Sequence, residues 1–277
     1  MRVSTSPGSS SGAWWTTAFA ALASTSPLPT VQPKLLGTFP HDQRAFTQGL
    51  HFEAKTGTLL ESTGMYGWST CRRVEIASGM VIQQEMLANH HFGEGLSVVD
   101  DDSNTLVQLL WREGLCQTRD ATTLQLRETL PLPTGMREGW GLTNDGQGAL
   151  WASDGTATLF ELDGASLEVT RRVEVHVPGL RRTVPRLNDL QWVDGRIWAN
   201  VWGDDRLACI DPTSGEVRGW VDLSGLLTPE ERDNLDYEEV LNGIAYDPNG
   251  APGGGGCLYV TGKNWPKLFQ IELPRVE

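Results

Sequence analysis

A short sequence motif occurs five times in the chain, and each copy ends in glycine or aspartate followed by leucine or isoleucine. The residue directly before this ending has a side chain that could take part in catalysis or ligand binding. These five residues are Gln48, Glu94, Trp140, Asn188 and Asn242. A carboxylate can accept and release a proton, and side-chain amides can donate hydrogen bonds to developing negative charge. Brought together, the five side chains would form a site for proton transfer beside an aromatic wall.

A second set of residues lies six positions into the strand expected after each motif. Its members are Gly64, Trp111, Gly155, Trp202 and Lys263. With Trp140 and the nearby Phe46, the two tryptophans would wall a pocket that also holds a carboxylate and an ammonium group. Such a pocket is typical of a small-ligand site. For any single position, the alternative stays open that a polar side chain in a water-filled channel is only solvated.

The two sets can meet only if the repeated motifs surround one axis. The anchor residues Gly49, Gly95, Gly141, Asp189 and Gly243 are 46, 46, 48 and 54 residues apart, close to the about 40 to 45 of known propeller blades. Turn signals and β-rich runs follow each anchor. We therefore predict an all-β fold, a five-bladed β-propeller with four-stranded blades. Trp151, Trp192 and Trp198 are expected to pack within or between the blades.

Two strands are left over at the ends of this repeat, over residues 34–40 and 267–273. Pairing them in one blade would close the ring and remove exposed sheet edges, so we predict that closure. One helix is expected at Thr228-Pro229-Glu230-Glu231, where Thr228 can cap and Glu231 can complete a capping box. This helix would be an insertion between the fourth and fifth blades.

The first 30 residues differ from the remainder. A short apolar run, "AWWTTAFAALA" (13–23), is typical of a signal peptide and is too short to span a bilayer. We therefore assign residues 1–30 to a signal peptide or a disordered tail, and 31–277 to a single propeller domain. A signal peptide predicts an exported protein, periplasmic or secreted. A disordered tail would also be compatible with a cytoplasmic protein.

The amino-acid composition limits the kinds of partner that the protein is expected to bind. The net charge of -13 disfavours nucleic acid and anionic membranes, and we expect a monomer without a membrane span. The four cysteines, Cys71, Cys116, Cys209 and Cys257, contain no C-x-x-C pair. They are expected to be scattered buried thiols, with pairing left open for an exported protein.

Within residues 31–277 the sequence contains no motif for several rival chemistries: a nucleophile elbow, a glycine-rich phosphate loop or an H-E-x-x-H helix. No catalytic metal or other cofactor is therefore expected. Oxygen ligands suit calcium, so Glu94, Asn188, Asn242 and a carbonyl could hold a structural calcium ion.

Several stretches in the expected order resemble the plant and bacterial glutaminyl-peptide cyclotransferase (glutaminyl cyclase) family. They include "FTQGL" (46–50), "FGEGL" (92–96), "EGWGLTNDG" (138–146), "LNDLQW" (187–192) and "VTGKNWPKLFQIEL" (260–273). The resemblance covers roughly residues 34–273. It implies a five-bladed propeller that converts the N-terminal glutamine of peptides to pyroglutamate with loss of ammonia, without the zinc of the unrelated animal type.

The resemblance also implies a set of site residues. They are Phe46, Gln48, Glu94, Trp111, Trp140, Asn188, Trp202 and Lys263. Two positions depart from the family pattern: "LNDLQ" stands where "LNELE" is usual, and Leu110 replaces a threonine before Trp111. Because Asn188 and Trp111 are retained, these departures bear on specificity more than on activity.

In such a cyclisation, the substrate's α-amine attacks its own side-chain amide. The amine must lose a proton and the leaving nitrogen must gain one, and we predict that Glu94 does both. Gln48, Asn188 or Lys263 could donate to the developing charge on the carbonyl oxygen, and Lys263 could instead keep Glu94 ionised through its charge; the sequence leaves these roles open. Phe46, Asn242 and the tryptophans are predicted to bind substrate. Two alternatives are a non-catalytic ligand-binding propeller and a metal-dependent lactonase-type propeller hydrolase, although Lys263 disfavours a tight divalent site.

Overall fold

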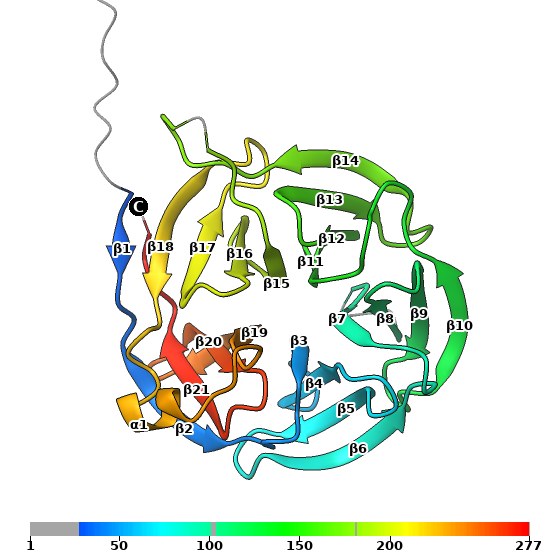
Figure 1. Cartoon of the computed structure of the whole chain (residues 1–277), viewed down its shortest axis with the longest axis horizontal. Helices are drawn as coiled ribbons and strands as arrows, with labels where there is room; N and C mark the ends of the chain where they lie inside the picture. Colours follow the sequence, from blue (N-terminus) through cyan, green and yellow to red (C-terminus); the bar gives the residue numbers. More distant parts are fainter. Residues whose placement is uncertain (1–27, 101–103, 181, 277) are drawn as a thin grey trace, which may run out of the picture.

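Five sheets surround a central axis in the computed structural model, which describes residues 28–100, 104–180 and 182–276 (Figure 1). Four strands pair in the first sheet, numbered outward from the axis: β3 (Thr47–Glu53), β4 (Thr58–Thr63), β5 (Thr70–Glu75) and β6 (Met80–Met86). We call this sheet blade 1. Blade 2 is formed by β7 (Gly93–Val98), β8 (Thr105–Leu110), β9 (Leu115–Asp120) and β10 (Leu126–Pro131). Blade 3 is formed by β11 (Leu142–Asn144), β12 (Ala149–Ser153), β13 (Thr158–Asp163) and β14 (Val169–Glu174).

The last two blades include strands from the beginning of the chain. Blade 4 contains β15 (Leu187–Val193), β16 (Arg196–Val201), β17 (Arg206–Ile210), β18 (Val217–Asp222) and, at its outer edge, β1 (Thr30–Val31). Blade 5 contains β19 (Leu241–Ala251), β20 (Gly255–Gly262), β21 (Lys267–Glu272) and β2 (Leu35–Pro40). The predicted five-bladed propeller is confirmed.

Burial explains the order of the strands within a blade. The inner strand β7 is buried at every residue, whereas the outer strand β6 alternates between exposed and partly buried side chains. An inner strand has neighbouring blades on both faces, so its residues are buried whether they are apolar, such as Leu96 and Val98, or polar, such as Glu94 and Ser97. Apolar clusters fill the space between adjacent blades; one joins Trp151 of blade 3 to Leu190 and Ile197 of blade 4. As predicted, the three packing tryptophans lie in these clusters or against them.

The glycine anchors let the inner strands touch one another at the axis. A Cβ atom on Gly95 would lie 2.4 Å from the carbonyl oxygen of Trp140, and one on Gly141 would lie 2.0 Å from that of Asn188. Only glycine fits such approaches. At the fourth anchor, Asp189 is fully buried and its Oδ2 accepts hydrogen bonds from the backbone N–H groups of Leu50 (3.3 Å) and Ile244 (2.9 Å). Burial raises the pKa of Asp189 to about 8.

The ring closes as the sequence predicts, because β2 pairs antiparallel with β21. In addition, β1 pairs parallel with β18, with Thr30 opposite Trp220. Leu28 packs against the core between blades 3 and 4, so residues 28–30, which we had placed in the N-terminal segment, are part of the fold. Residues 1–27 of the predicted signal peptide or disordered tail (1–30) lie outside the described residues.

The predicted helix is present as α1 (Pro229–Asp233), with Thr228 as its N-cap and both hydrogen bonds of the capping box. It precedes blade 5 at the rim of the propeller (Figure 1).

All four cysteines are buried free thiols, which agrees with the prediction of scattered buried thiols. In the described part of the chain, no helix has the length and apolar character needed to cross a bilayer.

Candidate active site

A cavity of about 500 Å³ opens where the inner strands begin and the second strands end. Eight of the nine predicted site residues line it: Phe46, Gln48, Glu94, Trp111, Trp140, Asn188, Trp202 and Lys263. They come from all five blades, which explains how residues far apart in the sequence share one site. The remaining lining residues, Met65, Phe92, Arg112, Arg186 and Glu238, were not predicted.

Glu94 is a buried carboxyl group in this cavity, with 3% of its surface exposed. Its Oε1 accepts a hydrogen bond of 3.1 Å from Nε2 of Gln48. Burial raises the pKa of Glu94 well above its ordinary value; the charge of Lys263 opposes this shift, and the charge of Glu138 adds to it. A carboxyl group with a raised pKa can exchange protons closer to neutral pH, as an acid–base catalyst must.

Asn242 lies behind Gln48 and does not line the cavity. It is fully buried, and its Nδ2 donates to Oε1 of Gln48 (3.2 Å) and to the backbone oxygen of Thr47 (3.0 Å). Because Oε1 of Gln48 is held by Asn242, the amide nitrogen of Gln48 faces Glu94. We predicted that Asn242 would contact substrate; its contacts are instead those of a positioning residue.

Lys263 is the buried cation of the cavity, with 4% of its surface exposed. Its Nζ lies 4.8 Å from the centroid of the Phe46 ring, within the range of a cation–π contact. Burial lowers the pKa of Lys263, while the charges of Glu94 and Glu238 act in the opposite direction. The ammonium group therefore supplies positive charge in a poorly solvated place.

Two of the three indole rings are held by one carboxylate that the sequence analysis missed. Oε2 of Glu138 accepts hydrogen bonds from Nε1 of Trp111 (2.8 Å) and of Trp140 (2.9 Å), while its Oε1 accepts one from Nε of Arg112 (3.0 Å). The Arg112 guanidinium in turn lies 3.7 Å from the centroid of the Trp111 ring. Burial raises the pKa of Glu138, but these hydrogen bonds outweigh it and lower the pKa overall.

The glycines of the second set make room for aromatic rings, from the neighbouring blade at Gly64 and from the same blade at Gly155. A Cβ atom on Gly64 would lie 2.2 Å from the Phe92 ring, and one on Gly155 would lie 2.6 Å from the Trp140 ring. Each position of the second set is therefore occupied either by a large side chain or by a glycine that leaves room for an aromatic ring from another part of the chain.

A signal for the missed residues was present in the sequence. Phe92, Glu138 and Arg186 each stand two positions before a predicted site residue, as does Phe46. These four residues lie just ahead of the inner strands at the same position of the repeat, so that position was also a candidate.

Residues 10–273 match the family model of the glutamine cyclotransferases. The chain belongs to this family. It is 40% identical over 240 residues to a glutaminyl-peptide cyclotransferase of Arabidopsis thaliana, covering 87% of this chain and 71% of the relative. The crystal structure of a glutaminyl cyclase from Myxococcus xanthus superposes with a TM-score of 0.76 at 34% identity, covering 91% of this chain and all of that chain. The cavity described above is thus the central pocket of a glutamine cyclotransferase family member.

Proposed function

We propose that this protein is a glutaminyl-peptide cyclotransferase, which converts the N-terminal glutamine of peptides or proteins to pyroglutamate and releases ammonia. One observation carries the proposal. In a member of this family, Glu94 is buried with a raised pKa in a cavity walled by Trp111, Trp140 and Trp202. The site thus combines a proton carrier with a place for an uncharged side chain.

The reaction forms one C–N bond and breaks another. The substrate's α-nitrogen bonds to the carbonyl carbon of its own side-chain amide, and the bond from that carbon to the amide nitrogen breaks. Glu94 accepts the proton that the α-amine loses and delivers it to the departing nitrogen, which leaves as ammonia. Both reacting groups are in one molecule, so holding the ring-like shape can supply a large part of the rate enhancement. The indole rings do this by packing against the glutamine side chain.

Negative charge develops on the carbonyl oxygen during the attack. The Lys263 ammonium and the Asn188 amide, both lining the cavity, are suited to stabilise it. The amide of Gln48 is fixed by Asn242 and bonded to Glu94, so we assign it the task of orienting the carboxyl group.

We also propose that the chemistry needs no zinc or other cofactor. In support, proton transfer and charge stabilisation both have candidates among the side chains. Furthermore, among residues 28–100, 104–180 and 182–276 no three His, Cys, Asp or Glu side chains group closely enough to hold a metal ion. The structural calcium ion and the export of the protein stay predictions.

The test is an ammonia-coupled assay on a short amidated peptide that begins with glutamine, run with and without a chelator. We expect ammonia in equal amounts in both samples. A peptide beginning with N-acetylated glutamine is the control, because its nitrogen cannot attack. No ammonia from the free peptide would favour the non-catalytic binding propeller, and activity on lactones that the chelator abolishes would favour the hydrolase.

A further inference from the structure

A second hollow of about 410 Å³ adjoins the active-site cavity on blade 4. Arg186 lines both, and Val201 in the hollow is followed directly by Trp202 in the cavity. We call this hollow the blade-4 groove. Its apolar surface is formed by Leu28, Val177, Leu180, Val184, Val201 and Trp220. A substrate that extends out of the cavity past Arg186 would therefore enter an apolar groove.

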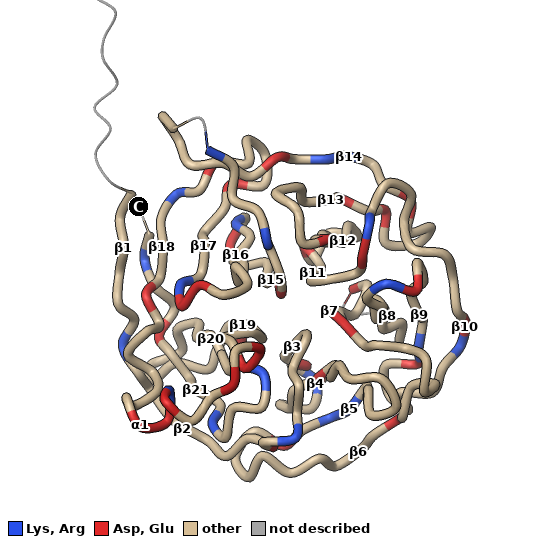
Figure 2. Tube along the Cα trace, viewed as in Figure 1, with Lys and Arg blue, Asp and Glu red and all other residues tan. Residues whose placement is uncertain are grey.

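The groove also carries uncompensated positive charge, although the whole chain has a net charge of -13. Its arginines are Arg182, Arg186 and Arg206, and its acidic residue is Asp204. Arg206 is paired with Asp204 at 2.7 Å. In contrast, the side chains of Arg182 and Arg186 are exposed and form no ion pair with another described residue. The connection from β14 to β15, residues 175–186, contains no acidic residue, and Figure 2 shows its basic segments.

Backbone contacts fix the position of Arg186 between the two hollows. Its φ is 66°, in the left-handed region that residues other than glycine rarely adopt. Its N–H donates to the oxygen of Gly155 (3.0 Å), and its oxygen accepts from the N–H of Trp202 (2.9 Å). The guanidinium group lies 5.7 Å from the centroid of the Trp202 ring. An unusual backbone conformation thus holds an unpaired cation at the edge of the cavity.

A different hollow adjoins the cavity on the side of blade 1, where Met65 lines both. It too contains arginines, but they are neutralised. Arg44 pairs with Asp42 (3.2 Å), and Arg72 pairs with Asp42 (3.0 Å) and Glu61 (2.7 Å). Among the described residues that line this hollow, both cations are paired, so neither is free to bind a ligand. The two sides of the cavity therefore differ in charge.

We propose that the residues following the N-terminal glutamine of the substrate pass over Arg186 into the blade-4 groove, and that Arg182 and Arg186 favour substrates with an acidic side chain there. This inference rests on the proposed function and names a class of substrate for it. An extended chain advances about 3.3 Å per residue. We therefore expect the second to fourth residues of the peptide to lie in the blade-4 groove.

The experiment measures kcat/KM by ammonia release for pentapeptide amides that begin with glutamine. Glutamate, glutamine or lysine is placed in turn at positions two, three and four, with alanine elsewhere. For the parent protein we expect glutamate to exceed glutamine by about three- to tenfold at one or more positions, and lysine to be poorest. The preference should weaken as salt is raised, because the arginines are exposed.

The double variant Arg182→Gln/Arg186→Gln should lose this preference. The matched control is Arg44→Gln, which removes an exposed arginine from the blade-1 side and should keep the parent's preference. The proposal is overturned if the parent does not distinguish glutamate from glutamine, if the double variant still does, or if Arg44→Gln loses the preference equally. Failure of the proposed function is a separate result, since no peptide in the series would then release ammonia.

Discussion

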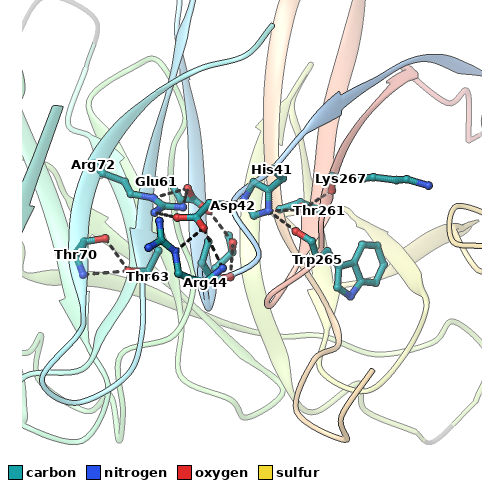
Figure 3. A network of polar contacts seen from close by, with 12 residues as sticks. His41, Asp42, Arg44, Glu61, Thr63, Thr70, Arg72, Thr261, Trp265 and Lys267 are labelled. Atoms are coloured by element: carbon teal, nitrogen blue, oxygen red, sulfur yellow. Dashed lines mark hydrogen bonds and ion pairs between the residues drawn. The ribbon is translucent and has the colours of Figure 1, made fainter. Parts of the chain in front are cut away.

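Two buried carboxyl groups near the inner strands of blades 1 and 2 have opposite surroundings. Glu61 on β4 is 1% exposed and Glu94 on β7 is 3% exposed, so burial alone does not distinguish them. Glu61 is surrounded by partners: Arg72 at 2.7 Å, His41 at 3.0 Å and the hydroxyl of Thr47 at 2.7 Å (Figure 3). Within the described part of the chain, the Glu94 carboxyl group accepts one hydrogen bond, from the uncharged Gln48.

The pKa values of the two groups follow these partners. Burial raises the pKa of both, but at Glu61 the charges of Arg72 and His41 outweigh burial, and its pKa is lowered. His41 donates to the backbone oxygen of Trp265 on blade 5 (2.7 Å), so the Glu61 network joins the first and last blades where the ring closes. The comparison indicates that full pairing makes a buried carboxylate structural, while sparse pairing leaves one free to carry a proton.

The largest effect is expected at Glu94. Replacing it in Glu94→Gln removes the proton carrier but keeps the shape and the hydrogen bonding of the side chain. We expect kcat to fall by about 10² to 10⁴, measured by ammonia release, with peptide binding retained in calorimetry. The exposed carboxylate variant Glu128→Gln is the control. Activity close to that of the parent would show that Glu94 is not the proton carrier, and Glu94 and Glu61 would then not differ in function.

The second effect is on stability. Glu61→Gln leaves the buried Arg72 guanidinium with Asp42 as its remaining charge partner and removes the partner of His41, which should cost about 3–5 kcal/mol in the free energy of unfolding. Urea unfolding followed by tryptophan fluorescence measures this. If Glu61→Gln unfolds like the parent, the network does not hold the ring closed.

A smaller effect tests whether Glu138 only stabilises the fold, as Glu61 does, or also supports the reaction, as Glu94 does. Glu138→Gln weakens the hydrogen bonds to both indole rings and the pairing with Arg112, so we expect kcat/KM to fall by about tenfold. The matched control is Glu161→Gln on β13, because Glu161 also pairs with an arginine (Arg171, 2.7 Å) that lies over a tryptophan, outside the cavity. An equal loss in both variants would mean that Glu138 only stabilises the fold.

The repeat in the sequence predicted the blades and eight cavity residues because the strand period of two fixes where each side chain points. Asn242 was misplaced for a local reason. Of the five anchors, all of which lie in the described residues, only Gly243 has a positive φ (107°), so the motif in blade 5 follows a different path. The blade-4 groove could not be predicted, because it depends on how residues 177–180 and 182–186 lie against β16 and β18.

The most direct test of the comparison is the free energy of unfolding of the parent, Glu94→Gln and Glu61→Gln measured from about pH 4 to about pH 8. An unfolded glutamate titrates near about 4.3. Since the folded pKa of Glu94 is raised, its ionisation costs stability above that pH, and Glu94→Gln should gain on the parent as the pH rises. Since the folded pKa of Glu61 is lowered, it contributes stability above that pH, so the deficit of Glu61→Gln should grow as the pH rises from about 4 to about 6, below the range in which His41 loses its proton. Opposite signs are the predicted result; changes of the same sign in both variants would contradict the account.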